Sequence, residues 1–459
     1  MPDSNSKERS ILKNGIMKKS VKLSLGTILL YNLAGFAFNL YDTILYAWLP
    51  YFYTPPESAH AVQYVSLGLF GFILAAGRIL DAFTDPFVGY MSDRTHSRWG
   101  RRKPFIFVSG PLLFIFFVLA WRPPVEGTSI VNAVYLGLVL FFYYWAYTGF
   151  LIPWLATLPE LSQKNDQRIK VVSVGIVLGT LGAIVGGGLS GMLIDTYSPF
   201  VMALILGSFA FVAGGLSLYG VKENYIPPKE ATDKKGFIKT FKEVFKDKQV
   251  LSFCGMIMFV QLTYQLMLMN VPYMTTLVLG QPKSAASVLM GEVILLMALS
   301  IPLWYFLLNK YPKRSVMRFI IGLMALGFCL SFFIGRINIF SPYIQAIIIL
   351  PIAAIPMGGM FTASLGLISD LTDYGELKKG TRTEAIYFGI YGIVRKTGWA
   401  FCSIILTTTF SIFGYSPENS FGVSVIWIIC ALSCIMGFIL FIPYKLGDTM
   451  EETKILIKK

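Results

Sequence analysis

Residues 222–248, KENYIPPKEATDKKGFIKTFKEVFKDK, form the longest stretch of the chain without apolar character, with eight lysines and five acids. On both sides of it the sequence consists mainly of apolar stretches of about 20 residues, the length that a helix needs to cross a bilayer. Six such stretches precede the charged segment and six follow it. This arrangement predicts an all-α membrane protein with 12 transmembrane helices in two six-helix halves, joined by a polar linker.

The composition of the 459-residue chain is typical of a membrane protein. Hydrophobic residues make up 55% of it and charged residues 14%, whereas a soluble chain would carry about 25% charge. Because backbone polar groups need hydrogen-bond partners in lipid, the apolar stretches are expected to be helices. Their approximate positions are 24–50, 62–92, 104–121, 130–156, 171–194, 199–221, 249–275, 286–309, 316–335, 341–369, 384–413 and 422–444. The predicted organisation is a tail at 1–23, a first half at 24–221, the linker at 222–248, a second half at 249–445 and a tail at 446–459.

The net charge of +14 raises nucleic-acid binding as an alternative, but the distribution of the charges argues against it. With the N-terminus inside the cell, 33 of the 39 lysines and arginines fall on the inner side, three on the outer side and three within spans. An excess of basic residues in cytoplasmic loops is the positive-inside rule of membrane proteins. We therefore predict a multi-pass protein of the cell membrane, inner or plasma, with both termini in the cytoplasm and no nucleic-acid partner.

The sequence lacks the clusters that catalysis or metal binding would need. Its two histidines, His60 and His96, fall on opposite sides of the predicted membrane, and its five cysteines lie in apolar spans without metal-ligand spacing. An integral membrane enzyme would need a clustered catalytic set. The sequence therefore argues against an enzyme, and it indicates no cofactor and no metal beyond a coupling cation.

Two acids lie inside the second apolar stretch, in GRILDAFTDPFVGY (77–90). Asp81 and Asp85 are four residues apart, so they share one face of a helix. An ionised acid at the centre of a membrane helix costs about 2.5–3.5 kcal/mol, and neighbouring carboxylates repel unless a cation or proton lies between them. We interpret the pair as a cation-coupling site, to which the Thr84 hydroxyl could add an oxygen ligand. The alternative is that the acids only pair with basic membrane residues such as Arg78.

Lys396 is the most deeply placed basic residue, in the middle of the eleventh stretch. It is a candidate counter-charge for an empty aspartate pair, in competition with the cation, and a permanent ion pair explains it equally well. The neighbouring Arg395 points about 100° away on a helix, so the two basic side chains are not expected to share a partner.

Further polar and aromatic residues within the spans are candidates for substrate binding. Asn39 and Asp42 are three residues apart in the first span. Glu292 lies roughly two turns from the outer end of the eighth, where it is equally compatible with a side chain that reaches the membrane surface. The acids are candidates for a substrate hydroxyl, a substrate ammonium group or the cation. Aromatic candidates for lining a cavity, for which simple packing is the alternative, are Tyr147, Trp154, Tyr387 and Trp399.

Three segments resemble a known family of transporters. Residues 77–106, GRILDAFTDPFVGYMSDRTHSRWGRRKPFI, closely resemble the glycoside-pentoside-hexuronide:cation symporter family, whose pattern is an Arg, a D-x-x-x-D-P pair and a basic loop ending in W-G-x-x-K-P. Residues 147–168 resemble the family's span 4 and loop 4–5. Residues 369–401 resemble its D-Y-G-E loop and the lysine of its span 11.

The resemblance implies a major facilitator fold, which also fits two six-helix halves with the substrate between them near the midplane. It further implies that Asp81 and Asp85 form the core of a sodium or proton site, which is assisted by Thr148 on span 4 and balanced by Lys396.

The sugar-binding residues of the melibiose-type members of that family are not retained here. Asn39 replaces an Asp of span 1, Leu151 replaces an Asp of span 4, and the Arg of span 5 falls near Ile176. A leucine cannot replace the hydration of a sugar hydroxyl. A different glycoside, bound by Asn39, Asp42 and Glu292, is one expectation. A lysophospholipid is the alternative, since the family resembles the lysophospholipid transporters of animal cells, which share D-A-F-T-D-P.

The loop SDRTHSRWGRRKP (92–104) resembles the G-x-x-x-D-R-x-G-R-R motif of the superfamily. We interpret it as a cytoplasmic gate, whose charges pair with helix ends across the halves in one state and release them in the other. The alternative is that these basic residues only set the topology. The predicted gate residues, including those of the D-Y-G-E element, are Gly89, Asp93, Arg94, Arg101, Arg102, Asp373 and Glu376.

Together these features predict a secondary active transporter. The expected activity is cation:solute symport, driven by Na+ or H+, by a protein that works through alternating access and functions as a monomer in membrane lipid. The expected substrate is a glycoside or another small carbohydrate, and a lysophospholipid or other amphiphile is the alternative. A non-transporting membrane receptor is a distant alternative, although a receptor would be expected to lose the charged pair.

Overall fold

The computed structural model describes residues 23–56, 62–95, 97–161, 165–223, 243–379 and 384–446. Most of the two predicted tails and of the linker, together with His60 and His96, lies outside these ranges. Within them the regular structure is helical, without a β-strand. The elements are α2 (Leu25–Tyr53), α3 (Leu67–Arg94), α4 (Lys103–Leu119), α5 (Ile130–Ala156), α6 (Leu158–Leu161), α7 (Asn165–Thr196), α8 (Pro199–Gly220), α10 (Lys248–Tyr273), the π-helical turn η2 (Met274–Val278), α11 (Lys283–Lys310), α12 (Lys313–Ser331), α13 (Pro342–Lys379), α14 (Glu384–Phe413) and α15 (Phe421–Phe441).

Ten helices of the described part of the chain are long and apolar enough to cross a membrane. This confirms the all-helical membrane class. The predicted stretch 104–121 falls mainly on α4, an apolar helix of 17 residues, and the stretch 384–413 coincides with α14.

Several helices extend beyond the apolar stretches that predicted them. The stretch 341–369 lies on α13, which continues to Lys379. The expectation that the D-Y-G-E element forms a loop is therefore wrong, because residues 373–376 are helical. The extension is held at the start of α10, where Asp247 accepts hydrogen bonds from Tyr374 and Lys378, one turn apart on α13. Hydropathy detects the part of a helix that matches lipid, and it misses polar turns of this kind.

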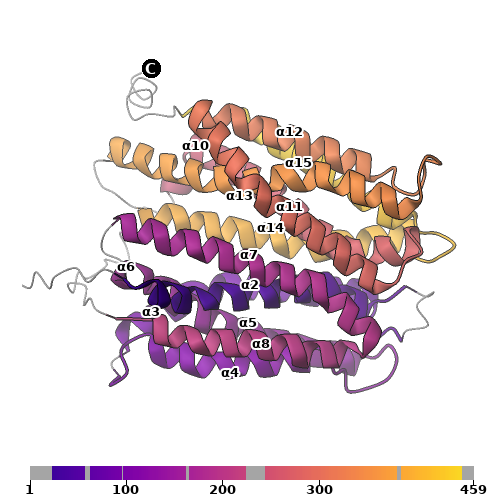
Figure 1. Cartoon of the computed structure of the whole chain (residues 1–459), viewed down its shortest axis with the longest axis horizontal. Helices are drawn as coiled ribbons and strands as arrows, with labels where there is room; N and C mark the ends of the chain where they lie inside the picture. The colour runs from indigo at the N-terminus through magenta and orange to yellow at the C-terminus, as the bar shows by residue number, and fades with distance from the viewer. Residues whose placement is uncertain are drawn as a thin grey trace, which may run out of the picture.

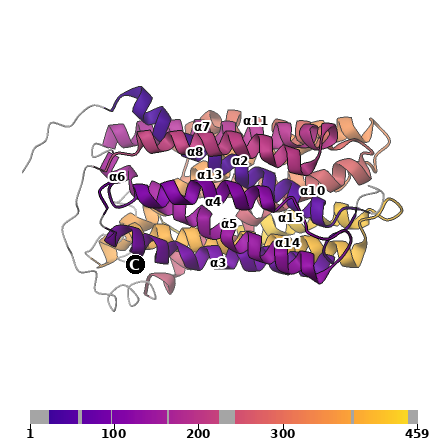
Figure 2. The same cartoon turned by 90° about the horizontal axis from the view of Figure 1, so that it is seen from below.

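The helices form two groups that pack along their lengths (Figure 1). Helices α2–α8 make one group, and α10–α15 make the other. The pairs that join the groups are α7 with α11, α3 with α14, and α2 with α10. Figure 2 shows the same α3–α14 and α7–α11 neighbours from another side.

Small residues allow α7 to pack closely both on α2 of its own group and on α11 of the other group. Gly182 and Gly186 of α7 lie against the backbone of α2 at Phe36 and Leu40, while Gly191 lies against α11 at Lys283. A side chain at any of these glycines would collide with backbone atoms. Helix α7 therefore bridges the two groups, in the way that small residues permit in membrane bundles.

The two ends of the bundle differ in charge and in contacts. We call the end that carries Arg94, Arg101, Arg102, Lys310 and Lys313 the basic end. At the opposite end, hydrogen bonds join the two groups directly. They connect Thr54 to Tyr273, Gly191 to Ser287, Asp195 to Ser284 and Gly71 to Ser403.

Candidate functional site

The predicted aspartate pair of α3 meets Lys396 of α14 in the interior of the bundle. The Lys396 Nζ lies 2.6 Å from Asp85 Oδ2 and 3.0 Å from Asp81 Oδ2. Pro86 follows directly and removes the backbone N–H that would bond to Ala82, so the helix is loosened beside the pair. The Asp81 side chain is fully buried, while that of Asp85 is 26% exposed. An ammonium group thus occupies the position between two carboxylates that a cation would take.

A threonine hydroxyl contacts the carboxylate oxygens of the two acids that do not contact Lys396. The Thr148 Oγ1 of α5 lies 2.7 Å from Asp81 Oδ1 and 3.2 Å from Asp85 Oδ1. The Thr84 Oγ1 lies 3.2 Å from the Thr148 Oγ1. Two carboxylate and two hydroxyl oxygens therefore converge, and oxygen donors are the ligands that hard cations take.

Arg78 links this pair to a third acid. Its guanidinium lies 3.2 Å from Asp81 Oδ2 and 3.1 Å from Asp42 Oδ1 of α2. The Tyr147 hydroxyl donates to the other oxygen of Asp42 at 2.7 Å. The Arg78 side chain is 1% exposed and that of Asp42 is 21% exposed. Asp42, predicted as a substrate ligand, is therefore part of the same polar network as the cation pair.

Aromatic rings enclose Arg78. Its guanidinium carbon lies 4.5 Å from the centre of the Tyr46 ring, 4.7 Å from that of Tyr144 and 5.4 Å from that of Trp399. Such cation–π contacts are strongest where water is excluded. Gly77 allows Tyr144 to approach, because a side chain at that position would collide with the ring.

The cluster of Asp42, Arg78, Asp81, Asp85 and Lys396 carries three acids and two bases. With all five groups ionised, its net charge is −1. An uncompensated charge in a buried site is unfavourable, and one added positive charge would neutralise this cluster. Arg395 does not alter this count of paired groups, since it stacks at 4.9 Å on Trp399 and forms no ion pair with the described acids.

Three other predicted substrate residues, Asn39, Trp154 and Tyr387, make their contacts outside the charged cluster. The Asn39 side chain donates to the backbone oxygen of Gly35 in its own helix and is otherwise exposed. The Trp154 indole donates to the Tyr31 backbone oxygen and stacks on the Tyr31 ring at 5.0 Å, which fixes the start of α2 to the end of α5. Tyr387 is buried against Gly375 of α13, as a packing residue would be.

Glu292 lies apart from the cluster. On α11 it is half-buried and shares a stripe with Val288 and Leu295, whose side chains are exposed. It forms no hydrogen bond or ion pair with the residues that the structure describes. The structure therefore does not bring Glu292 together with Asn39 and Asp42.

The predicted gate residues form their contacts at the basic end. Arg102 pairs with Asp93 at 3.0 Å and with Glu160 at 2.8 Å, and Arg101 pairs with Glu160 at 2.7 Å. Glu223 accepts the backbone N–H groups of residues 101–103 at the start of α4. These contacts all lie within the α2–α8 group.

The remaining gate residues lie near these charges or in the second group. Gly89 precedes the loop on α3, and Arg94 stacks at 4.1 Å on the Tyr90 ring. Asp373 and Glu376 lie on the last turns of α13, beside the contacts of Asp247. Burial would raise the pKa of Asp247, but hydrogen bonds from Lys378, the Gln249 backbone and Tyr374 hold it below its ordinary value.

Sequence reasoning missed several residues of the site. Glu160 and Glu223 are acids that lie at the ends of apolar stretches, on the same predicted side of the membrane as the basic loop. That position in the sequence is the signal that could have identified them as partners of the loop. Tyr46 and Tyr144 had no such signal, because the chain contains 24 tyrosines. Only the fold shows which of them surround Arg78.

Comparison with known proteins places this geometry in a family. The isoprimeverose transporter of Lactiplantibacillus pentosus is 25% identical over 85% of this chain and 81% of its own length. The glucuronide carrier protein homolog of Escherichia coli K12 is 24% identical over 93% of this chain and 94% of its own. The sodium-dependent lysophosphatidylcholine symporter 1 of Gallus gallus is 24% identical over 76% of this chain and 72% of its own.

The fold also matches solved transporters. The crystal structure of a point mutant of the nucleoside transporter NupG superimposes with a TM-score of 0.69 at 15% identity, and the match covers 92% of this chain and 100% of that one. The family described as MFS/sugar transport protein matches residues 30–445. The chain therefore belongs to the MFS/sugar transport protein family, and it fits the glycoside-pentoside-hexuronide:cation symporters of the major facilitator superfamily.

Proposed function

We propose that this protein is a secondary active transporter that couples the uptake of a glycoside to a cation. The observation that carries the proposal is the buried cluster of three acids and two bases, with a net charge of −1, at the contact between the two helix groups. The family and its sugar-transporting relatives support the same activity.

The proposed topology has 12 spans. Helices α4 and α14 join the ten that meet the criterion of length and hydropathy, because each packs alongside its neighbours through the bundle. The halves are residues 24–221 and 249–445, and the basic end lies in the cytoplasm by the positive-inside rule. The protein then resides in the cell membrane as a monomer, with both termini inside.

The proposed mechanism is alternating access by rocking of the two groups. Hydrogen bonds join the groups at the outer end, which is the arrangement expected of a state closed to the outside. A cation that enters between Asp81 and Asp85 displaces the Lys396 ammonium, which belongs to the other group. The cation thereby changes a contact between the groups, and coupling to the substrate must be reciprocal.

We propose Na+ as the coupling ion, with H+ as the alternative. A proton needs only one carboxylate, whereas this cluster offers oxygens from Asp81, Asp85, Thr84 and Thr148. Such a set of hard donors suits a metal cation better than a proton.

A lysophospholipid is the second candidate substrate. Leu151 and Ile176 supply no hydrogen bonds where the melibiose-type members have charged residues, and a relative in Gallus gallus is a lysophosphatidylcholine symporter. The glycoside is preferred because the polar cluster of Asp42, Arg78 and Tyr147 offers both donors and acceptors to hydroxyl groups.

Uptake into liposomes that contain the purified protein tests the function. We expect radiolabelled isoprimeverose or lactose to accumulate only when an inward Na+ gradient is applied. Accumulation driven by a pH gradient in K+ medium would identify the proton instead. Na+-driven uptake of lysophosphatidylcholine without uptake of either sugar would favour the second substrate.

Replacing Lys396 with methionine should tighten Na+ binding by on the order of tenfold or more. The reason is that a positive charge about 3 Å from the acids is worth several kcal/mol even at an effective dielectric constant of about 20. Na+ titration by thermal shift measures the change. Lys378→Met, which removes a lysine that is paired with Asp247 at the basic end, is the control. Equal Na+ affinity in the Lys396 variant and the wild type would show that the lysine does not compete with the cation.

A further inference from the structure

Two glutamines of α10 are buried, and each has side-chain amide atoms without a partner among the described residues. Gln261 is fully buried, and both its side-chain nitrogen and its oxygen lack a hydrogen bond among the described residues. Gln265, one turn later, is 2% exposed, and its side-chain oxygen also lacks a partner there. Buried polar groups without hydrogen bonds are rare in proteins and unfavourable. Two of them on one helix therefore indicate a ligand-binding surface.

The helix face that carries these glutamines is directed away from lipid. Leu262 of α10 contacts α14 through Cys402, and Tyr264 contacts α13 through Phe361. At about 100° per residue, Gln265 and Gln261 fall between these two directions. The side of α10 that packs on α15, at Thr263, lies across the helix from them. The glutamines thus face the region between α13 and α14, and α2 also packs on this helix.

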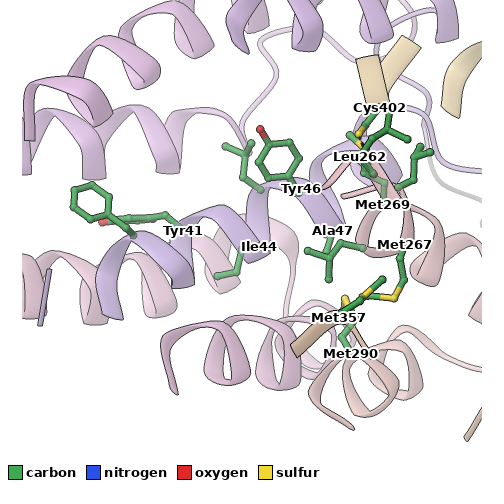
Figure 3. Packing of buried hydrophobic residues seen from close by; sticks show 14 of the residues in the cluster. Tyr41, Ile44, Tyr46, Ala47, Leu262, Met267, Met269, Met290, Met357 and Cys402 are labelled. Atoms are coloured by element: carbon green, nitrogen blue, oxygen red, sulfur yellow. Dashed lines mark hydrogen bonds between the residues drawn. The ribbon is translucent and has the colours of Figure 1, made fainter. Parts of the chain in front are cut away.

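The two helices that meet there are in register. Thr54 of α2 and Tyr273 of α10 are joined by a hydrogen bond of 2.9 Å at the outer end, and both helices run toward that end. Eight residues back from each partner, about 12 Å along each helix, lie Tyr46 and Gln265. Tyr46 is also buried, with its hydroxyl unpartnered among the described residues. Figure 3 shows Tyr46 of α2 in the same buried cluster as Leu262 and Met269 of α10.

Counting residues back from Thr54 and Tyr273 in the same way places Gln261 at the depth of Asp42, one turn further toward the basic end. Twelve residues separate Asp42 from Thr54 and Gln261 from Tyr273, which corresponds to about 18 Å in each helix. Gln261 and Gln265 therefore lie at the level of the charged cluster, on the opposite half of the protein. The Trp399 indole nitrogen, which borders Arg78, is likewise unpartnered among the described residues.

The chemistry of a carboxamide fits a sugar better than a lipid or an ion. Each glutamine offers two N–H donors and a carbonyl acceptor, which match adjacent hydroxyl groups that both donate and accept. An apolar chain would leave these groups unsatisfied, and a cation would use only the oxygen. On the other half, Leu151 provides no hydrogen bond to a sugar.

We propose that Gln261 and Gln265 form the second-half wall of the substrate site, where their amides bind hydroxyl groups of a transported glycoside. The inference rests on the proposed symport activity and adds the residues that recognise its substrate. It also assigns sugar recognition to both halves, with Asp42 and Tyr147 opposite the glutamines. Closure of the halves around a sugar would then satisfy the amides and the first-half groups together.

Binding measurements on Gln261→Leu and Gln265→Leu test the proposal. Leucine is similar in size, and it removes a buried polar group that has no partner among the described residues, so the melting temperature without sugar should stay equal or rise. The dissociation constant for isoprimeverose or lactose should rise about tenfold or more, with Na+ affinity unchanged. Thr263→Val is the matched control, because Thr263 is buried on the same helix and bonds to its own backbone.

The outcomes separate this inference from the proposed function. If the wild type binds neither sugar in Na+, the sugar-symport function fails and the inference fails with it. If the wild type binds a sugar and both glutamine variants bind it with equal affinity, the inference alone is overturned. A loss of melting temperature in the leucine variants before sugar is added would show that the amides serve the fold instead.

Discussion

Replacing Asp85 with asparagine is expected to abolish Na+-driven accumulation of substrate. The change removes one of three acids from a cluster with two bases, so the net charge rises from −1 to zero and the attraction for a cation is lost. It also removes the 2.6 Å contact with Lys396, which joins the two helix groups. We expect Na+ affinity to fall by at least about 100-fold, equivalent to about 2.8 kcal/mol. Exchange of labelled for unlabelled sugar, which needs no Na+ gradient, should persist, because the variant keeps the rest of the site.

Liposome uptake with and without a Na+ gradient measures this effect, and exchange of labelled for unlabelled sugar shows that the variant is folded. Asp370→Asn is the matched control, since Asp370 is a partly exposed acid that pairs with a lysine of its own helix group, Lys313 at the basic end. Asp81→Asn should give the same transport defect with a greater loss of stability, because Asp81 is fully buried and contacts Arg78, Lys396 and Thr148. Undiminished Na+-driven accumulation in both variants would exclude the pair as the coupling site.

Much of the fold was accessible from the sequence because membrane insertion depends on local composition. Apolar stretches of about 20 residues mark helices directly, and the described helices overlie them. The polar turns at helix ends, outside the apolar stretches, could not be predicted by the same rule. The end of α13 shows why: its last turns are held by Asp247 of another helix, and hydropathy does not report a contact between distant segments.

The site was accessible only where one helix carried the information. Asp81 and Asp85 share a face because of their four-residue spacing, and that spacing is visible in the sequence. The contact of Asp42 with Arg78 was not visible, since it depends on how α2 packs against α3. The periodicity of one helix shows which residues point together and does not show what they point at.

The glutamines of α10 also could not be identified as site residues from the sequence. An amide carries no charge, so Gln261 in an apolar stretch gives no electrostatic signal of the kind that identifies Asp81. Its importance lies in the absence of a partner among the described residues, a property of packing that exists only in the folded chain. Glu292 is the converse case, because an intramembrane acid gives a strong signal although its side chain forms no hydrogen bond or ion pair with the described residues.

Replacing Arg78 with methionine is expected to destabilise the protein by about 3–5 kcal/mol, the usual cost of leaving buried acids without their partner. Arg78 is 1% exposed and is the basic group that contacts Asp42 in the described structure, whereas Asp81 keeps Lys396. The loss should appear as a lower melting temperature and a poorer yield of folded protein in detergent. Since the cost arises mainly from the charge on Asp42, the double variant Arg78→Met/Asp42→Asn should recover part of it.

Arg395→Met is the matched control for this prediction. Arg395 is also an arginine within a membrane helix and stacks on the same Trp399 ring as Arg78, but it forms no ion pair with the described acids. Its loss should therefore remove a cation–π contact of about 0.5–2 kcal/mol without exposing a buried charge. An equal fall in melting temperature for the two single variants would assign the role of Arg78 to its aromatic contacts. Recovery in the double variant, with sugar binding still impaired, would instead separate the two roles of Asp42: it is a charge that Arg78 must balance and an acceptor for the substrate.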